Sequence, residues 1–584
     1  MSRPGKSTVE RPPQGGAFPE RDCRRSLAVS VPVPLGLEIG GACDTDGVPR
    51  FFNTAGPVVA AKHYCIPPLD RLDLRDALNL IRTERYFVLH APRQTGKTSA
   101  LLALRDLLNR GGEGDYRCVY VNVEPAQAMR EDVEGAMRAI LGALASWART
   151  TLGDGFLDEE WPGILAKHGP AGALGEALAR WSEADATPLV LFVDEIDSLV
   201  GDTLLSVLRQ LRAGYVRRPE GFPQSVVLCG VRDVRDYRIH SSAEQAVIAG
   251  GSAFNVKARS LRLGDFSRDD VTALLAQHTG ETGQAFEPEA LETIWERTRG
   301  QPWLVNALAD ETCFRKEVGR DRSRPITADD VHDAQERIIQ RRETHLDQLA
   351  DKLQEDRVRR VVEPLLSGGD ERHFSARDIE YVRDLGLVAS DPPLRIANPI
   401  YAEVVPRELT AAAQEGLVQE LAWYVDADGG LDVVKLLAAF QTFFREHAEH
   451  WVARFDYREA GPQLLLQAFL QRVVNGGGRI EREYGLGRGR TDLLIVWPQR
   501  DRRSDGGGRE PRQTRRFVVE CKILHKSLER TIHDGLSQTA AYMDRCAAEA
   551  GHLVIFDRSD RAWEEKVFHR RESAGRADVH VWGM

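Results

Sequence analysis

The amino-acid sequence predicts a multidomain α/β protein. Its length of 584 residues suggests about four domains at roughly 150 residues each. Hydrophobic residues make up 42% of the chain, which excludes a wholly disordered or fibrous protein. From Leu78 to Asp265, short β-rich runs alternate with helical patterns. The strand candidates are 86–90, 118–123, 189–194 and 225–230. The last two are almost continuously apolar. Parallel strands that are covered on both faces have this pattern, so we expect a parallel sheet between helices.

Five segments are predicted along the chain. The first is rich in Pro, Gly, Arg and Ser without apolar periodicity, which indicates a disordered tail. We place the boundaries as follows: tail 1–45, α/β core 46–265, helical segment 266–345, helix-and-hairpin domain 346–412 and a second α/β domain 413–584.

The helical segment carries two signals for helix starts. Ser267 is followed three residues later by Asp270, and Thr327 is followed in the same way by Asp330, so each pair resembles a capping box. The charged stretch 329–355 predicts one long exposed helix.

Composition limits the setting of the protein. The chain has no apolar run of the ~18 residues that a membrane span needs, and its N-terminus lacks the apolar region of a secretory signal. Its eight cysteines are scattered and include no CxxC pair, which favours a reducing cytoplasm over a disulfide framework. The net charge is −10, so contact with nucleic acid requires a local basic patch.

The first chemical motif lies between the strand 86–90 and the helical run that starts at Ser99. Its residues are Ala91, Pro92, Arg93, Gln94, Thr95, Gly96, Lys97 and Thr98. Backbone N–H groups in such a loop point at phosphate oxygens, and Gly96 allows a close approach. Lys97 would reach the β- and γ-phosphates, and the Thr98 hydroxyl would bind Mg²⁺. Ala91 stands where a glycine is usual, which requires a negative φ there.

A second motif ends the apolar strand 189–194. The strand finishes in Asp194 and is followed by Glu195 and Asp197. Asp194 would hold Mg²⁺ through water, and Glu195 would polarise the attacking water. An acidic helix cap after a core strand is the alternative, and the phosphate loop upstream in the same segment argues against it.

Together these motifs resemble the P-loop ATPases of the AAA+ and STAND type, especially the origin-recognition-like branch, over residues 76–345. The resemblance implies ATP and Mg²⁺ as cofactors and a homo-oligomer formed on ATP binding. It places Arg232 or Asp233 near the sensor-one position, although the family usually has Asn, Thr or Ser there. Pro302, in the sequence Gly-Gln-Pro-Trp, resembles the lid proline that packs near the base.

Two further features carry open alternatives. Arg217 and Arg218 are candidates for an arginine finger acting across a subunit boundary, or they mark a solvated helix end. Residues 375–388 and the predicted hairpin 391–398 resemble a winged helix. Because acidic and basic residues balance on its helix, packing or regulation is favoured there over direct contact with DNA.

A second constellation lies near the C-terminus. Asp492 stands in a strand-like segment, and Glu520 and Lys522 stand in the next, after the polar insertion 498–516, which predicts a mobile hairpin. Residues i and i+2 of a strand share a face, so Glu520 and Lys522 point the same way and Cys521 points into the core. Two carboxylates on neighbouring strands can hold Mg²⁺ or Mn²⁺.

This arrangement resembles the PD-(D/E)XK nuclease superfamily, over residues 450–584. The resemblance implies that Asp492 and Glu520 hold the metal. It also implies that Lys522 orients the nucleophile or stabilises the developing charge. It makes Gln538, four residues before Tyr542, an accessory residue.

The upstream glutamate that is usual in this superfamily has two candidates. Glu459 is the first candidate and Glu483 the second. An exposed Glu–Lys ion pair remains the alternative for the whole motif. Residues 479–530 contain 14 Lys and Arg against 8 Asp and Glu, a local net charge of +6 that suits a phosphate backbone.

The sequence therefore predicts an ATPase core with a helical lid, a winged helix and a restriction-endonuclease-like domain. We expect an ATP-hydrolysing protein that controls a metal-dependent nuclease acting on nucleic acid, with DNA preferred by resemblance, in prokaryotic defence or DNA processing. The alternative is a nucleotide-switched regulator whose nuclease-like domain binds without cleaving.

Overall fold

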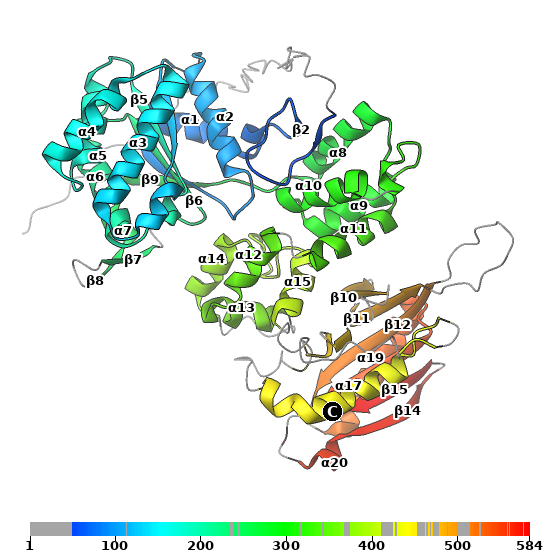
Figure 1. Ribbon diagram of the computed structural model, residues 1–584. Helices are drawn as coiled ribbons and strands as arrows, with labels where there is room; N and C mark the ends of the chain where they lie inside the picture. Colours follow the sequence, from blue (N-terminus) through cyan, green and yellow to red (C-terminus); the bar gives the residue numbers. More distant parts are fainter. Residues whose placement is uncertain are drawn as a thin grey trace, which may run out of the picture. The chain divides into compact units, whose positions relative to one another are not determined.

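The computed structural model (Figure 1) describes residues 49–584 apart from short gaps. The gaps are 113, 234–236, 242–245, 316–317, 342–343, 367–373, 410–423, 427–428, 453–461, 463–464, 468, 471–477, 487–488, 499–513, 525–526, 558, 560 and 576. The predicted tail 1–45, Glu459 and most of the polar insertion 498–516 therefore lie outside the described residues.

The first α/β body is built on a five-stranded parallel sheet, ordered β4-β5-β6-β3-β9. Its strands are β3 (Tyr86–His90), β4 (Arg117–Asn122), β5 (Leu189–Asp194), β6 (Ser225–Gly230) and β9 (Lys257–Arg262). All residues of β5 and β6 are buried, which confirms the prediction made from their apolar runs. The phosphate-loop strand β3 and the acidic strand β5 both neighbour β6, so the ends of all three lie at one edge of the sheet.

Helices cover both faces of this sheet because alternate residues of each strand point to opposite sides. Phe87 and Leu89 pack with one helical layer, whereas Tyr86 and Val88 pack with the other. The first layer contains α1 (Leu74–Arg82) and α2 (Lys97–Asn109). The second contains α3 (Val133–Leu152), α4 (Phe156–His168), α5 (Ala173–Glu183) and α6 (Gly201–Gly214). The small elements β7 (Arg238–Ser241), β8 (Ala246–Ala249) and α7 (Gly250–Ala253) precede β9.

The helical segment after β9 forms a second core. Its helices are α8 (Arg268–Thr282), α9 (Pro288–Thr298), α10 (Pro302–Asp310) and α11 (Ala328–Gln340). Both predicted capping boxes are present: Ser267 with Asp270 begins α8, and Thr327 with Asp330 begins α11. Phe52 and Tyr64 join the same core from the two short parallel strands β1 (Phe51–Phe52) and β2 (His63–Tyr64).

The prediction of one long exposed helix over 329–355 is wrong. α11 ends at Gln340, and α12 (Thr344–Lys352) is a separate helix. Each helix buries an apolar face, with Ile338 in α11 and Leu349 in α12. Both residues lie in the second core, which α8, α9 and α10 also form. The carboxylate of Glu311 also accepts hydrogen bonds from Arg341 at 2.7 and 3.0 Å, just after α11. The burial of two apolar faces, and not the charge of the stretch, therefore determines its structure.

The helix-and-hairpin domain continues that core. It contains α13 (Asp356–Leu366), α14 (Ala376–Asp384) and α15 (Pro399–Leu409). The predicted turn around 391–398 is present as a narrow hairpin, in which Val388 and Ile396 form an antiparallel bridge.

The C-terminal body is a second α/β domain with a mixed six-stranded sheet, ordered β10-β11-β12-β13-β15-β14. The strands are β10 (Arg479–Leu486), β11 (Gly489–Pro498), β12 (Thr514–Ile523), β13 (Ala550–Phe556), β14 (Phe568–Ala574) and β15 (Ala577–Gly583). β12, β13 and β15 are parallel, and the outer pairs are antiparallel. A short helix, α20 (Trp563–Lys566), precedes β14.

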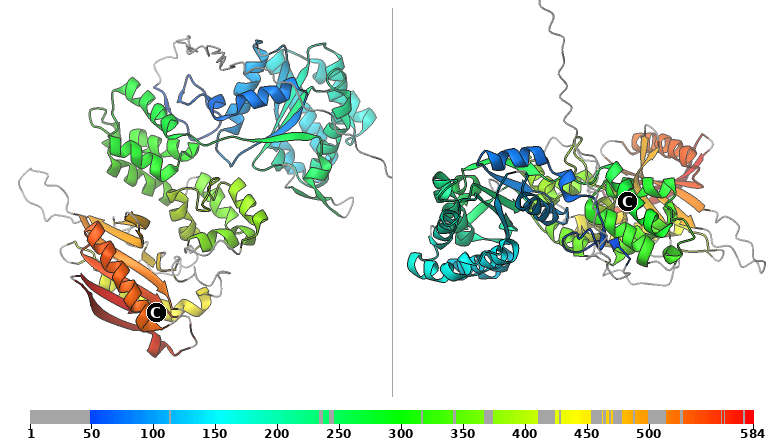
Figure 2. Two further views of the ribbon diagram at one scale, coloured as in Figure 1. Left: turned by 180° about the vertical axis from the view of Figure 1, so that it is seen from behind. Right: turned by 90° about the horizontal axis from the view of Figure 1, so that it is seen from above.

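A long helix packs on each face of this sheet. α17 (Val433–Val452) packs on the face that contains Leu493 and Val519, and it lies in front of the sheet in Figure 1. α19 (Leu528–Cys546) packs on the face that contains Leu494 and Val518, as the view from behind shows (Figure 2).

A buried histidine is expected to make this domain sensitive to acid. His552 is 1% exposed, stands opposite His580 in the sheet and accepts a hydrogen bond from Trp582 Nε1 at 3.3 Å. Burial lowers the pKa of His552 from 6.5 to about 3. Because the unfolded chain binds this proton first, the free energy of unfolding should fall as pH drops from about 6.5 towards 3 and stay level above that window.

Hydrogen exchange of β13 and β15, measured in the full chain across that window, checks this expectation. Protection should decrease steadily in the wild type and much less in His552→Gln, whose side chain does not titrate. Equal pH slopes in the two proteins would assign the acid sensitivity to other groups.

Candidate functional site

The phosphate-loop motif forms a tight turn between β3 and α2. Ala91 has a negative φ, as its place in the motif requires, and its N–H donates to the carbonyl of Gly230 at 3.3 Å. Gly96 precedes the first turn of α2 with a φ of +90°, a backbone conformation that glycine adopts readily. The loop thus ends at a helix N-terminus, where free N–H groups favour an anion.

Lys97 and Thr98 occupy the first turn of α2. Lys97 is 6% exposed, and its Nζ donates to the carbonyls of Ala91 and Pro92, at 3.0 Å each. Thr98 Oγ1 donates to Asp194 Oδ2 at 2.7 Å. The structure therefore brings together the loop and the acidic strand end, which are almost a hundred residues apart. Hydroxyl and carboxylate oxygens are ligands that suit Mg²⁺, so this pair fits that ion.

Tyr120 is a member of this site that the motifs did not reveal. Its hydroxyl donates to Asp194 Oδ2 at 3.0 Å. Burial, reinforced by Asp194, raises the pKa of Tyr120 well above its usual value, so the phenol keeps its proton. Asp194 is fully buried, and the two hydroxyl groups stabilise its carboxylate in a fixed orientation.

Glu195 follows in a left-handed backbone conformation, with a φ of +56°. Burial raises the pKa of its carboxyl, nearby Lys97 opposes that shift, and Asp197 adds to it. A carboxylate with a raised pKa is a stronger base than an ordinary glutamate, which suits a residue that accepts a proton from water.

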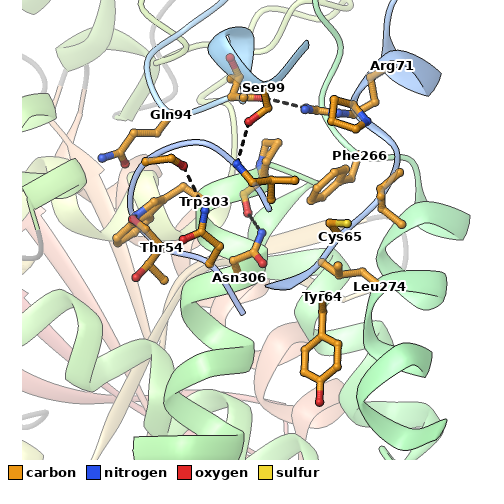
Figure 3. Close-up of a pocket in the computed structure, with 18 of the residues that line it drawn as sticks. Thr54, Tyr64, Cys65, Arg71, Gln94, Ser99, Phe266, Leu274, Trp303 and Asn306 are labelled. Atoms are coloured by element: carbon orange, nitrogen blue, oxygen red, sulfur yellow. Dashed lines mark hydrogen bonds between the residues drawn. The ribbon is translucent and has the colours of Figure 1, made fainter. Parts of the chain in front are cut away.

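A cavity of about 130 Å³ adjoins the loop (Figure 3). Thr95 and Gly96 contribute one wall, and Pro302 and Trp303 of α10 contribute another. Trp303 Nε1 donates to the carbonyl of Thr54 at 2.9 Å, which holds the N-terminal segment over this space. Gln94 also lines it. Pro302 thus lines the same cavity as Thr95 and Gly96 of the phosphate loop.

Arg93 and Arg232 lie beside a different cavity, which Pro92 of the phosphate loop and Asp197 also line. This second cavity has a volume of about 320 Å³, and residues of α12 and α14 contribute to it as well. The Arg232 guanidinium lies over the rings of Tyr237 and Tyr381, at 5.0 and 5.1 Å. Asp233, the alternative at this position, is 2% exposed and accepts a hydrogen bond from Lys257 at 2.7 Å.

The two candidate finger residues are held by their own chain. The Arg218 guanidinium lies 3.4 Å from the centre of the Tyr215 ring, whereas Arg217 donates to Glu183 at 2.8 Å in an exposed ion pair. Both precede β6, which is parallel to β3, so they lie near the N-terminal ends of these strands. The phosphate loop follows the C-terminal end of β3.

In the C-terminal body, β12 presents Glu520 and Lys522 on the face that α19 covers. Glu520 is 2% exposed, and Lys522 Nζ donates to its Oε1 at 2.8 Å. Cys521 is buried on the opposite face, as the sequence predicts. A buried carboxylate beside a lysine is not the exposed ion pair of the alternative interpretation.

Strand register relates the remaining acidic candidates to Glu520. Leu493 of β11 pairs with Val519 of β12, and one further step in that register sets Asp492 opposite Glu520. On the other side of β11, Arg482 pairs with Leu493 and Tyr484 pairs with Thr491, so Glu483 stands opposite Asp492. Three acidic residues thus occupy one line across three strands.

The accessory candidates lie on α19. Tyr542 is buried against the sheet, whereas Gln538 is exposed. Glu459 is outside the described residues, and so are the side chains of Asp492 and Glu483. Among the side chains that are described, no group of three or more His, Cys, Asp and Glu is arranged to hold a metal.

The comparison with protein families concerns the first α/β body. Residues 81–237 match the family model described as "AAA domain", which supports an AAA-type ATPase core in this part of the chain. No curated protein matches the chain. None of the helices in the described ranges is long and apolar enough to cross a membrane.

Several solved structures resemble the chain at low identity. A Walker-type ATPase of Pyrococcus abyssi has 14% identity and a TM-score of 0.42, over 61% of this chain and 99% of its own. Cdc6p from Pyrobaculum aerophilum has 15% identity and a TM-score of 0.32, over 62% and 97%. Domain III of the replication initiation protein DnaA from Thermotoga maritima has 12% identity and a TM-score of 0.29, over 46% and 92%.

Proposed function

We propose that this protein is an ATPase that controls a metal-dependent nuclease site in its C-terminal domain. The observation that carries the first half is the bond between Thr98 and Asp194, which joins the phosphate loop to the acidic strand end. Thr98 and Asp194 would hold Mg²⁺, Lys97 would bind the β- and γ-phosphates, and Glu195 would accept the proton of the attacking water. When bound, Mg²⁺ supplies charge neutralisation at the phosphates.

The cavity beside the loop supports ATP as the nucleotide. Gly96 of the loop and Pro302 both line it, so we expect the phosphates at the loop and the base near Pro302. Arg93 and Arg232 are proposed contacts at the phosphate end, since the cavity that both line also borders Pro92 of the loop.

The proposal of a nuclease depends on the buried pair Glu520 and Lys522 and on the register of Asp492 beside them. Two carboxylates would hold Mg²⁺ or Mn²⁺, which supplies an activated water and neutralises the scissile phosphate. Lys522 would orient that water or stabilise developing charge. Gln538 stays an accessory candidate. The register supports Glu483 as a candidate for the upstream acid beside Glu459, because Glu483 stands opposite Asp492.

DNA is the proposed substrate, and the setting is the cytoplasm of a cell that processes its own DNA or attacks foreign DNA. The basic segment 479–530 supplies the charge for a phosphate backbone. Incubation of the purified protein with DNA and RNA, with Mg²⁺, Mn²⁺ and ATP each present or absent, tests this proposal. Metal-dependent cleavage of DNA supports it, and absence of cleavage under every condition contradicts it.

A nucleotide-switched regulator is the second candidate. The observation that favours it is that Lys522 already pairs with Glu520, which lowers the negative charge available to a metal. In that case the protein binds nucleic acid in an ATP-dependent manner and leaves it intact. The helix-and-hairpin domain, which we propose to be a winged helix, would then carry the signal by packing against the ATPase.

ATP-dependent self-association is a further part of the proposal. Arg217 is the better candidate for a residue that acts in a neighbouring subunit, because Arg218 is held against Tyr215. Sedimentation with a non-hydrolysable ATP analogue should show an assembly for the wild type. Arg217→Ala should still bind ATP and lose most of its hydrolysis.

Arg138 offers a matched control, since it also forms an exposed ion pair, with Glu134 at 3.3 Å. Arg138→Ala should behave as the wild type. A nucleotide-bound wild type that stays monomeric at micromolar concentrations would exclude this part of the proposal.

A further inference from the structure

Arg71 contacts two distant parts of the ATPase body at once. It ends a short 3₁₀ turn, Pro68–Arg71, before α1. Its Nη1 donates to the carbonyl of Thr95 at 2.7 Å, in the phosphate loop, and to the carbonyl of Gly264 at 3.0 Å. The backbone carbonyl of Arg71 accepts a bond from the N–H of Gly264 at 3.3 Å. These bonds join segments that are 24 and 193 residues away from Arg71 in the sequence.

The bond to Thr95 fixes the direction of one peptide unit. Thr95 is 1% exposed, and its hydroxyl donates to the carbonyl of Pro92 at 2.8 Å. In a planar trans peptide, the carbonyl of one residue and the N–H of the next point in opposite directions. Because the Thr95 carbonyl points at the guanidinium, the N–H of Gly96 points away from it. That N–H is the last of the loop before α2 and belongs to the expected phosphate cradle.

Gly96 and Arg71 also fit each other sterically. A Cβ on Gly96 would lie 2.6 Å from Arg71 Nη2, so the guanidinium fills the space that a side chain would need. The φ of +90° at Gly96 belongs to the region that L side chains rarely adopt. Together the two residues hold the loop in one conformation.

The second carbonyl that Arg71 binds lies where the ATPase core continues into the lid. Gly264 stands between β9 and α8, and the guanidinium lies 4.9 Å from the ring of Phe266 in the same connection. A change in the loop at Thr95 and a change in the direction of the lid therefore act on the same side chain.

We infer that Arg71 is a positioning residue that directs the Gly96 N–H toward the nucleotide phosphates and couples the phosphate loop to the connection between core and lid. This inference rests on the proposed binding of ATP. The inference predicts two effects of losing Arg71. The β-phosphate is bound more weakly, and two segments that are distant in sequence become looser.

Arg71→Met tests the inference, because methionine keeps an apolar stem near Phe266 and removes the hydrogen bonds. The affinity for ADP and ATP should fall about tenfold, the effect of one charged hydrogen bond. The affinity for AMP, which has no β-phosphate, should stay the same. Arg71→Lys keeps the charge and one donor group and should recover part of the loss. Arg75→Met, at an exposed position of α1, is the control and should match the wild type.

Hydrogen exchange without nucleotide gives a second and independent readout. In Arg71→Met, exchange should accelerate in the peptides that cover 92–99 and 262–268 and stay unchanged in β4 and β5. Equal losses of AMP and ADP affinity would show a merely structural role and overturn the inference, and so would unchanged exchange in both peptides. If the wild type binds no nucleotide, the proposed function fails, and the exchange measurement still decides whether Arg71 holds the loop.

Discussion

Lys97→Ala should weaken ATP binding by about a hundredfold or more, the effect of losing two charged hydrogen bonds to phosphate oxygens. Lys97 Nζ now donates to the carbonyls of Ala91 and Pro92, so the ammonium already lies inside the loop. Titration calorimetry with ATP measures the loss. Lys167→Ala, at an exposed position of α4, should bind as the wild type does.

Glu195→Gln should separate binding from turnover at the same site. ATP affinity should remain, and hydrolysis should fall by about 10²–10⁴-fold, the usual contribution of a general base. Because burial raises the pKa of Glu195, its carboxylate is lost at a higher pH than in an ordinary glutamate. The wild-type rate should therefore fall on the acid side at a pH above 4.5, the usual pKa of this side chain.

Glu220→Gln, an exposed change in the same body, is the control for this second variant. Hydrolysis of ATP by Glu195→Gln at the wild-type rate would show that another group is the base.

Glu520→Ala should remove nuclease activity, because the metal loses a buried carboxylate that lies on the same strand face as Lys522. Asp492→Ala should have the same effect for the same reason. Lys522→Ala should leave metal binding largely intact and slow cleavage. None of the three should change ATP affinity, because the phosphate loop lies in a different domain. Cleavage of plasmid and linear DNA in Mg²⁺ and in Mn²⁺ measures these effects.

Glu565→Ala changes an exposed carboxylate of the same domain and should cleave normally. Equal cleavage by the wild type and Glu520→Ala would reveal a contaminating nuclease. Metal binding that survives in both carboxylate variants would place the metal elsewhere.

Local patterns were sufficient for the ATPase core. The runs 189–194 and 225–230 are apolar throughout, and only a strand covered on both faces buries every residue in this way. The loop 91–98 is one continuous motif between a strand and a helix, so its conformation follows from neighbouring residues. The capping boxes at Ser267 and Thr327 were likewise readable, because each joins residues only three positions apart.

Contacts between distant residues could not be read in the same way. Arg71 and Tyr120 carry no motif, and their roles follow only from hydrogen bonds that span 24, 193 and 74 residues. The prediction of one long helix over 329–355 was wrong for a related reason. Its charges suggested an exposed helix, and the apolar residues between them are buried by partners elsewhere in the chain.

The upstream acid of the C-terminal site shows how register adds to pattern. Sequence alone favoured Glu459 because a helix was expected nearby. A shift of one residue would move Glu483 to the other face of the sheet, and the observed pairing sets it opposite Asp492. The relative position of β10 and β11 is therefore the observation that supports Glu483.

The most direct test of an ATPase that controls a nuclease is the initial rate of DNA cleavage in Mg²⁺, with and without ATP, for the wild type and Lys97→Ala. The account predicts that ATP changes the rate for the wild type and leaves it unchanged for Lys97→Ala, and that Glu520→Ala does not cleave in either condition. Cleavage by the wild type that is the same with and without ATP would contradict nucleotide control, and no cleavage in any condition would contradict the nuclease itself.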